Sequence, residues 1–290
     1  MTTGCALLEI APFDLHATFD MQLIGRFDPT GSRGALSLRK IHLDARGNVV
    51  VWRFSRTPTA LRIEGHGDDG GLLDVMTRQF PLADGADAFE PAHPVLRRLS
   101  HGYRGLRLMR VPWTFDVAAA TVLQQRVRWR TAYSDFRRVA LRFGTRAEGG
   151  VAFPTSSRLA AVPVARLEAM GIDPRRARAL HLLAEADARH SFLHPAADPD
   201  AVTRRLLSIR GIGPWTAGRV AGLAFGNADA VPVGDLHIPS LVTSALAGEP
   251  SGTDERMLEL LAAYPGQRFR VIRLLQWAAR RAPHVLHPSR

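Results

Sequence analysis

Apolar and polar residues alternate along several short stretches of the first third of the chain, and this period of two is typical of half-buried β-strands. The alternating stretches are residues 13–26, 37–43, 48–54 and 61–64. The second and third stretches flank a turn-forming segment at residues 44–47, which predicts a hairpin. Residues 72–80 instead have the apolar spacing of a short helix. The N-terminal region is therefore expected to be a small α+β unit with an antiparallel sheet.

From residue 95 onward, apolar residues recur at helical spacing almost without interruption. The helices expected toward the C-terminus are residues 201–207, 214–223, 236–246, 254–263 and 267–281. Residues 81–94 contain proline and glycine and read as a linker. The pattern therefore predicts an α+β protein, with an α+β domain and its linker at residues 1–94 and a mostly helical domain at residues 95–290.

The most informative stretch is residues 206–237. An apolar helical run ends at Leu207, Gly211 and Gly213 follow, and Pro214 begins a second helical run. Glycine allows the positive φ of a tight hairpin, and proline suits the first turn of a helix. Such a hairpin exposes several backbone N–H groups that bind phosphate without reading base edges, so it predicts sequence-independent DNA binding. The alternative is a glycine-rich turn between two packed core helices.

A single carboxylate, Asp235, follows this hairpin at the start of the next helical run. Residues 227–231 read as a turn and a short extended segment, and Pro232 and Gly234 interrupt the backbone before Asp235. An aspartate in this position caps a helix N-terminus in many proteins. A capping role and a role in chemistry are compatible, because a helix N-terminus favours a nearby negative charge.

Composition narrows the range of partners. The 290 residues carry a formal net charge of +11 and a pI of about 11.2, which indicates a polyanion or an anionic membrane surface as partner. Almost all of the basic residues are arginine, since Lys40 is the only lysine. The lone Cys5 excludes a disulfide framework and a four-cysteine iron–sulfur cluster. No apolar run reaches about 18 residues and no secretory leader is evident, so we expect an intracellular protein.

The sequence LLSIRGIGPWTA followed by VPVGD resembles the helix-hairpin-helix, Gly/Pro, Asp (HhH-GPD) superfamily of DNA base-excision glycosylases. Within it, the chain is most similar to the bacterial 3-methyladenine DNA glycosylase II family. The 20 residues from Trp215 to Asp235 fit that family's spacing between hairpin and catalytic aspartate. The resemblance covers about residues 95–280 and implies a helical region of two subdomains, with Asp235 as the catalytic residue.

The resemblance also implies roles for other side chains. It places Trp215, Arg219, Gln125 and Phe269 around the base pocket, and Gly211, Gly213, Thr216, Arg126 and Arg210 at the DNA. Residues 111–132 resemble the long helix that enters the duplex, with Arg126 where the family has an apolar wedge. For Trp215 and Phe269 the alternative is a core aromatic, and for the arginines of residues 126–130 it is a solvated helix face. The best-known members have an aromatic residue at the position of Arg219, one helical turn after Trp215. This difference makes an oxidised or deaminated purine a candidate substrate as well.

A glycosylase flips the damaged nucleotide out of the duplex and hydrolyses its N-glycosidic bond. A carboxylate beside C1′, here Asp235, stabilises the positive charge that develops on the sugar. Relatives that also cut the strand have a Schiff-base lysine at position 215, whereas this chain has Trp215. We therefore expect a monofunctional enzyme of the DNA-3-methyladenine glycosylase II type, which acts on alkylated bases.

Two alternatives remain open from the sequence. One is a glycosylase for oxidised or deaminated purines, and the other is a catalytically silent protein that binds DNA damage. In each case we expect the partner to be double-stranded DNA and not a membrane. We also expect the protein to be a monomer that is located in the bacterial cytoplasm, at the nucleoid. We expect no cofactor and no metal site, apart from a monovalent cation held by hairpin carbonyls of residues 208–213 when DNA is bound.

Overall fold

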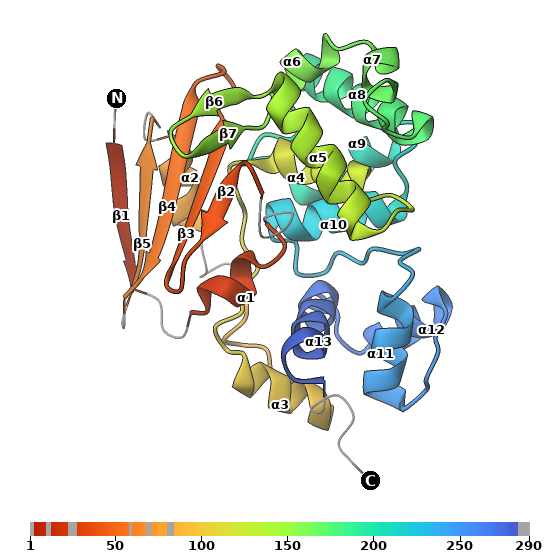
Figure 1. Ribbon diagram of the computed structural model, residues 1–290. Helices are drawn as coiled ribbons and strands as arrows, with labels where there is room; N and C mark the ends of the chain where they lie inside the picture. Colours follow the sequence, from red (N-terminus) through yellow and green to blue (C-terminus); the bar gives the residue numbers. More distant parts are fainter. Residues whose placement is uncertain are drawn as a thin grey trace.

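The computed structural model describes residues 3–9, 13–22, 28–57, 60–67, 71–79 and 84–283. It confirms the α+β class, because an antiparallel sheet at the N-terminus is followed by a helical region (Figure 1). The sheet and the helices share one continuous cluster of buried apolar residues, which extends from Phe13 to Ala278. None of the helices in these described ranges is long and apolar enough to span a membrane.

Five antiparallel strands form the sheet in the order β1-β5-β4-β3-β2. They are β1 (Thr3–Glu9), β2 (Gly31–Arg33), β3 (Ser37–Leu43), β4 (Val49–Arg56) and β5 (Ala60–His66). The predicted pairing of β3 with β4 is confirmed, with Ile41 opposite Val51. Alternate residues of β4 are fully buried, among them Trp52 and Phe54, because one face of the sheet packs against the helices.

The prediction of a strand over residues 13–26 is wrong where the structure describes the segment. Residues Leu15–Phe19 form helix α1, and Asp14 caps it by accepting a hydrogen bond from the Ala17 amide at 2.9 Å. A run of five residues is too short for a period of two to be told from a period of 3.6. Residues 23–26 of the prediction lie outside the described ranges.

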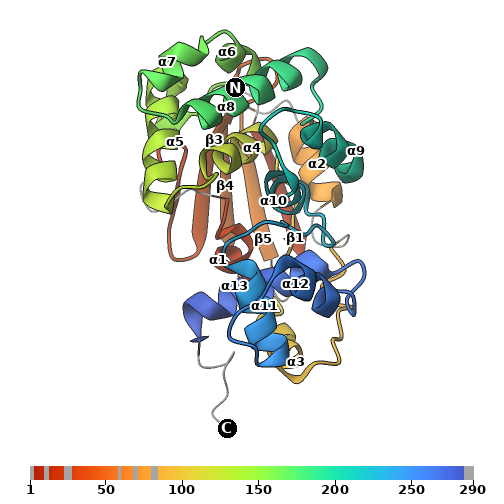
Figure 2. The ribbon, with the colours of Figure 1, turned by 90° about the vertical axis from the view of Figure 1, so that its right-hand side faces the viewer.

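Helices make up most of the remaining chain. They are α2 (Gly71–Gln79), α3 (Pro94–Gly102), α4 (Thr114–Leu123), α5 (Trp129–Phe143), α6 (Ser156–Ala160), α7 (Val164–Glu168), α8 (Pro174–His190), α9 (Pro199–Leu207), α10 (Pro214–Phe225), α11 (Ile238–Ala247), α12 (Asp254–Leu261) and α13 (Arg268–Arg281). The helices α4–α10 form one group, and α3 and α11–α13 form a second group below it (Figures 1 and 2).

Two features of the helical region differ from the sequence prediction. A short hairpin of β6 (Thr145–Ala147) and β7 (Gly150–Ala152) interrupts the series of helices. This hairpin contacts the N-terminal region, because the Val151 amide donates to the Pro29 carbonyl at 2.8 Å. The expected long helix at residues 111–132 is also broken, because α4 ends at Leu123 and α5 begins at Trp129. No glycine or proline marks this break in the sequence.

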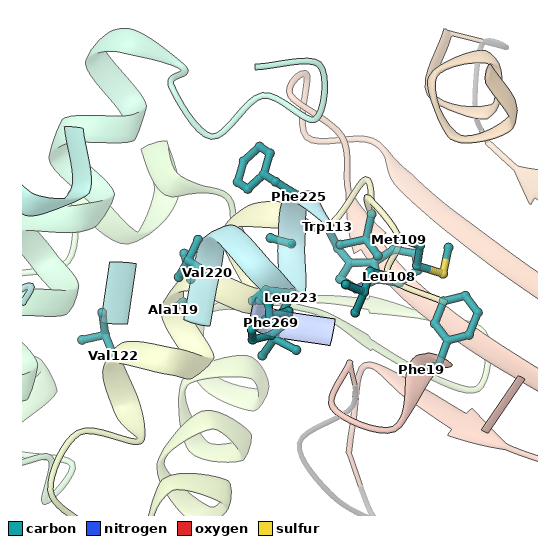
Figure 3. Packing of buried hydrophobic residues seen from close by; sticks show 14 of the residues in the cluster. Phe19, Leu108, Met109, Trp113, Ala119, Val122, Val220, Leu223, Phe225 and Phe269 are labelled. Carbon is teal, nitrogen blue, oxygen red and sulfur yellow. The ribbon is translucent and has the colours of Figure 1, made fainter. Parts of the chain in front are cut away.

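Helix α10 lies at the centre of the helical core. All of its residues from Thr216 to Phe225 are buried. A Cβ added at Gly222 would lie 2.4 Å from the Phe269 ring of α13, so this close approach of two helices requires glycine. Leu223 and Phe269 belong to the same apolar cluster around α10 (Figure 3). The third turn of α10 is therefore packed closely against α13.

The sheet contains a buried neutral histidine. Trp52 donates its indole N–H to Nε2 of His42 at 2.8 Å, so the imidazole proton lies on Nδ1 and donates to the Leu43 carbonyl at 3.0 Å. Burial, with the nearby charge of Lys40 as a smaller cause, lowers the pKa of His42 to about 3. This ring therefore stays neutral in the folded protein down to acidic pH.

We expect His42 to make the protein less stable in acid. Because the folded pKa of about 3 lies below the ordinary value of about 6.5, only the unfolded chain takes up the proton between these values. The free energy of unfolding should therefore fall by about 1.4 kcal/mol per pH unit below pH 6.5 from this group. Urea unfolding between pH 7 and 4.5 measures it. His42→Gln, which keeps an acceptor for Trp52, should have a shallower slope than wild type, and the same substitution at exposed His101 is the control for the loss of a histidine. Parallel curves for His42→Gln and wild type would contradict the expectation.

Candidate active site

The glycine hairpin joins α9 to α10. Buried Ile209 and Ile212 anchor it, while Arg210 and Gly211 are exposed between them. Gly211 has a φ of 91°, the left-handed conformation that favours glycine. Of the two glycines, only Gly211 uses the positive φ that glycine allows, because Gly213 has an extended φ of −106° and ψ of −176° and serves as N-cap of α10. Among the described residues no side chain caps α10, so the first amides of the helix have no side-chain acceptor and suit an anion.

Gln125 braces the hairpin from the turn between α4 and α5. Its side-chain amide donates to the Gly211 carbonyl at 3.0 Å and to Oγ1 of buried Thr216 at 2.9 Å. The next residue, Arg126, is exposed and has a φ of 54°, which is a strained conformation for a residue other than glycine. The broken helix thus places the hairpin, Gln125 and Arg126 on one surface.

Asp235 lies between α10 and α11 with its carboxylate fixed on both oxygens. Oδ2 accepts a hydrogen bond from Nε1 of Trp215 at 2.7 Å. Oδ1 accepts from the amides of His237 at 2.8 Å and Ile238 at 3.0 Å, and Ile238 begins α11 two residues later than expected. The N-cap of α11 is His237 and not Asp235 as predicted, although the Asp235 carboxylate accepts from the first helical amide, and the same carboxylate is bonded to Trp215 of α10. These bonds hold the half-buried Asp235 in one orientation.

Arg219 lies one helical turn beyond Trp215. Its guanidinium carbon is 5.2 Å from the centre of the Trp215 ring, within the range of a cation–π contact. An Nη2 hydrogen of Arg219 bonds Oε1 of Gln124 at 3.2 Å. The side chain is only 7% exposed, and this burial lowers the pKa of Arg219 while the charge of Asp235 opposes the shift.

A cavity of about 210 Å³ opens beside Arg219. Its walls come from both the sheet region and the helices, and they include Gln22, Lys40, Asp116, Gln124, Trp129, Arg219 and Leu223. Trp215 and Asp235 do not line it. Arg219 is therefore the side chain that borders both the cavity and the Trp215–Asp235 pair.

A buried ion pair of this cavity was not identified from the sequence. Lys40 of β3 is 1% exposed, forms an ion pair with Asp116 of α4 at 3.0 Å and donates to Oγ1 of Thr30 at 2.6 Å. Burial raises the pKa of Asp116, and Lys40 opposes the rise. Two signals could have found the pair: Lys40 stands at an inward position of an alternating strand, and Asp116 is the one charge in the apolar run of α4.

The predicted site residues therefore fall into three places. Trp215, Arg219 and Asp235 are brought together, and Gln125, Thr216 and the glycines form the hairpin surface. Phe269 is 3% exposed and packs α13 against Gly222 of α10, and it does not line the cavity. Trp129, which was not singled out from the sequence, is 63% exposed at the cavity rim.

Comparison with known proteins matches residues 119–265 to the family described as HhH-GPD superfamily base excision DNA repair protein. The Bacillus subtilis (strain 168) protein YfjP, provisionally named a DNA-3-methyladenine glycosylase, is 26% identical to this chain over 188 residues. The match covers 62% of this chain and 64% of YfjP, so the chain spans less than two thirds of the length of YfjP.

Among solved structures, the 3-methyladenine DNA glycosylase of Archaeoglobus fulgidus has a TM-score of 0.75 at 20% identity and covers 96% of this chain and 99% of its own. The Clostridium acetobutylicum 8-oxoguanine glycosylase/lyase, solved with double-stranded DNA, has a TM-score of 0.66 at 16% identity and covers 92% of both chains. At these identities the two structures show a shared fold.

The two hairpin glycines should respond differently to alanine. A Cβ at Gly211 would meet Ala179 at 3.0 Å in a left-handed conformation, so Gly211→Ala should lower the free energy of unfolding by about 1–2 kcal/mol. A Cβ at Gly213 meets nothing within 4 Å, so Gly213→Ala should keep the stability and weaken binding to an abasic duplex. Urea unfolding and fluorescence anisotropy measure the two effects, with Gly102→Ala as the control for both. Full DNA affinity of Gly213→Ala would show that phosphate does not approach the hairpin.

Proposed function

Since the chain belongs to the HhH-GPD superfamily of base excision DNA repair proteins, we propose that it removes damaged bases from duplex DNA as a monofunctional glycosylase. The observation that carries the proposal is the carboxylate of Asp235, fixed by Trp215 and by the first amides of α11 beside the hairpin. This arrangement presents one oriented negative charge next to a surface suited to a DNA backbone.

The DNA backbone binds at the hairpin in this proposal. The uncapped N-terminus of α10 offers amides to a phosphate, and exposed Arg210 adds a positive charge beside it. The net charge of +11 provides long-range attraction to the duplex. The Clostridium acetobutylicum neighbour, which was solved with double-stranded DNA, supports this assignment.

Base flipping requires a group that fills the gap, because unstacking a nucleotide costs roughly a few kcal/mol. Arg126 projects from the strained turn between α4 and α5 and is exposed. Trp129, three residues later, adds an exposed aromatic surface on which a base can stack. We assign the wedge to Arg126 and a stacking role at the rim to Trp129.

Cleavage of the glycosidic bond breaks the link between C1′ and the base nitrogen. Positive charge develops on the sugar, and the carboxylate of Asp235 stabilises it. Water adds to C1′, the base leaves with one proton from that water, and an abasic site remains. The hydrogen bonds from Trp215, His237 and Ile238 keep the carboxylate in place, so it needs no reorganisation during the reaction.

Strand cleavage after base removal needs an amine that forms a Schiff base. Position 215 has a tryptophan, and Lys40, the only lysine, is buried in its ion pair with Asp116. We therefore assign hydrolysis without lyase activity. The chemistry assigned to Asp235 requires no metal or organic cofactor. A monovalent cation at carbonyls of residues 208–213 remains part of the proposal, with the Gly211 carbonyl already accepting from Gln125.

The lesion is a damaged purine. The names of YfjP and of the Archaeoglobus fulgidus enzyme favour alkylated bases such as 3-methyladenine. One observation favours an oxidised or deaminated purine instead, because a buried guanidinium, not an aromatic ring, lies over Trp215. The site beside Asp235 serves the same hydrolysis for either class.

Replacing Asp235 by asparagine should separate binding from chemistry. Asp235→Asn keeps an acceptor for Trp215 but loses the charge, so single-turnover base release should fall by roughly 10²–10³-fold. Affinity for an abasic duplex should change little, and the control Glu255→Gln, an exposed carboxylate of α12, should match wild type. Duplexes with methylated, deaminated and oxidised purines provide the substrates. Equal rates for Asp235→Asn and wild type would refute the catalytic assignment, and binding without any base release would indicate a silent damage-binding protein.

A further inference from the structure

The loop that carries Asp235 lies between α10 and α11 and connects the two groups of helices (Figure 1). Just before the carboxylate, at residues 232–234, this loop has few polar contacts. The Val233 amide bonds a carbonyl of the loop itself. The Gly234 amide donates to Oδ2 of Asp254, the first residue of α12, at 2.9 Å. Among the described residues, this is the one hydrogen bond that ties residues 232–234 to a helix.

Asp254 is not needed to cap its own helix. That role belongs to Thr253, whose Oγ1 accepts from the Arg256 amide at 3.3 Å. The charge of Asp254 suits a helix N-terminus, but exposed Glu255 in the same turn supplies a charge of the same sign. Oδ1 of Asp254 is buried and has no hydrogen-bond partner among the described residues, which is unfavourable for a carboxylate. The specific contact of this side chain is therefore its bond to the loop of Asp235.

Gly234 depends on this bond because little else restrains it. Its φ of 92° is in the left-handed region, which is one of many conformations open to glycine. A Cβ at this position would lie 4.0 Å from Cβ of Trp215 and closer to nothing else outside its chain neighbours, so crowding does not hold the residue in place. Gly234 directly precedes the carboxylate, and a change in its backbone angles would move the Cα of Asp235. The hydrogen bond to Asp254 thus fixes the point from which the Asp235 side chain extends.

We propose that Asp254 is a positioning residue for the hydrolysis, which acts through Gly234 on the place of the Asp235 carboxylate relative to C1′. The hydrogen bonds from Trp215 and from the first amides of α11 set the rotation of the carboxylate, whereas Asp254 fixes the backbone that bears it. A displacement of about 1 Å at a reacting group can cost roughly 10²-fold in rate. This inference rests on the proposed glycosylase function and extends the site to α12.

Three substitutions of Asp254 separate the position of the acceptor from the charge. Asp254→Asn keeps an acceptor oxygen in place without the charge, Asp254→Glu keeps the charge and moves the acceptor by one methylene, and Asp254→Ala removes both. Asp254→Asn should keep the single-turnover rate of base release within about 3-fold of wild type, whereas Asp254→Glu and Asp254→Ala should lower it by roughly 10- to 10²-fold. Affinity for an abasic duplex should change little in all three, because the loss lies in the chemical step.

A double variant distinguishes positioning from a merely structural role. If Asp254 acts through the Asp235 carboxylate, then Asp254→Ala should have no further effect on the rate of Asp235→Asn, in which that carboxylate is already lost. A loss of packing or stability would instead lower the rate by the same factor in both backgrounds. Urea unfolding of each variant shows that the rates are measured on folded protein.

The control is Glu255→Ala, which removes a carboxylate from the same turn of α12 and should keep the wild-type rate. A wild-type rate for Asp254→Ala would overturn the inference, as would equal effects of Asp254→Ala in the two backgrounds. Slow Asp254→Asn together with fast Asp254→Glu would also overturn it, because the charge and not the acceptor would then matter. If Asp254→Ala does not fold, the comparison of Asp254→Asn with Asp254→Glu still decides. Each of these results leaves the glycosylase function standing, whereas a wild type that releases no base from methylated, deaminated or oxidised duplexes would refute the proposed function and this inference together.

Discussion

The carboxylate of Asp235 is held from two sides, by the indole N–H of Trp215 and by the first amides of α11. Each partner belongs to a helix whose position depends on other packing. Helix α10 is buried along its second and third turns and approaches α13 at Gly222, where no side chain larger than hydrogen fits. The orientation of one carboxylate therefore depends on how closely the two groups of helices pack. The same packing places the hairpin that precedes α10 at a fixed distance from Asp235.

The N-terminal sheet contributes to the cavity as well as to the core. Lys40 extends from β3 to Asp116 of α4, and Gln22 donates to the carbonyl of Leu223 at 2.6 Å. The first contact connects the sheet with α4, and the second connects the N-terminal region with α10, the helix that bears Trp215 and Arg219. Because an unpaired buried charge is strongly unfavourable, the ion pair makes the position of the sheet specific. The sheet thus contributes Lys40 to the cavity lining, a role that the alternating pattern of β3 alone does not reveal.

The parts of the site that are local in sequence could be predicted. Glycine chemistry, a proline at a helix start and an aspartate after a backbone break are signals within a few residues, so the hairpin and the position of Asp235 just before α11 could be predicted. The break between α4 and α5 was not, because it lacks glycine and proline and its Gln125 is held by the hairpin some 86 residues away. The ion pair of Lys40 with Asp116 and the stacking of Arg219 on Trp215 depend on tertiary packing. Helix α1 was mistaken for a strand because five residues carry too little periodicity.

The central claim is that the protein hydrolyses a glycosidic bond and leaves the strand intact. Mass spectrometry of the products from duplexes with a single damaged purine, with and without borohydride, measures this most directly. The account predicts a free base, an abasic strand of unchanged length and no covalent protein–DNA adduct. An adduct trapped by borohydride or a cleaved strand would contradict the assignment of simple hydrolysis, and the absence of any free base would contradict the glycosylase function.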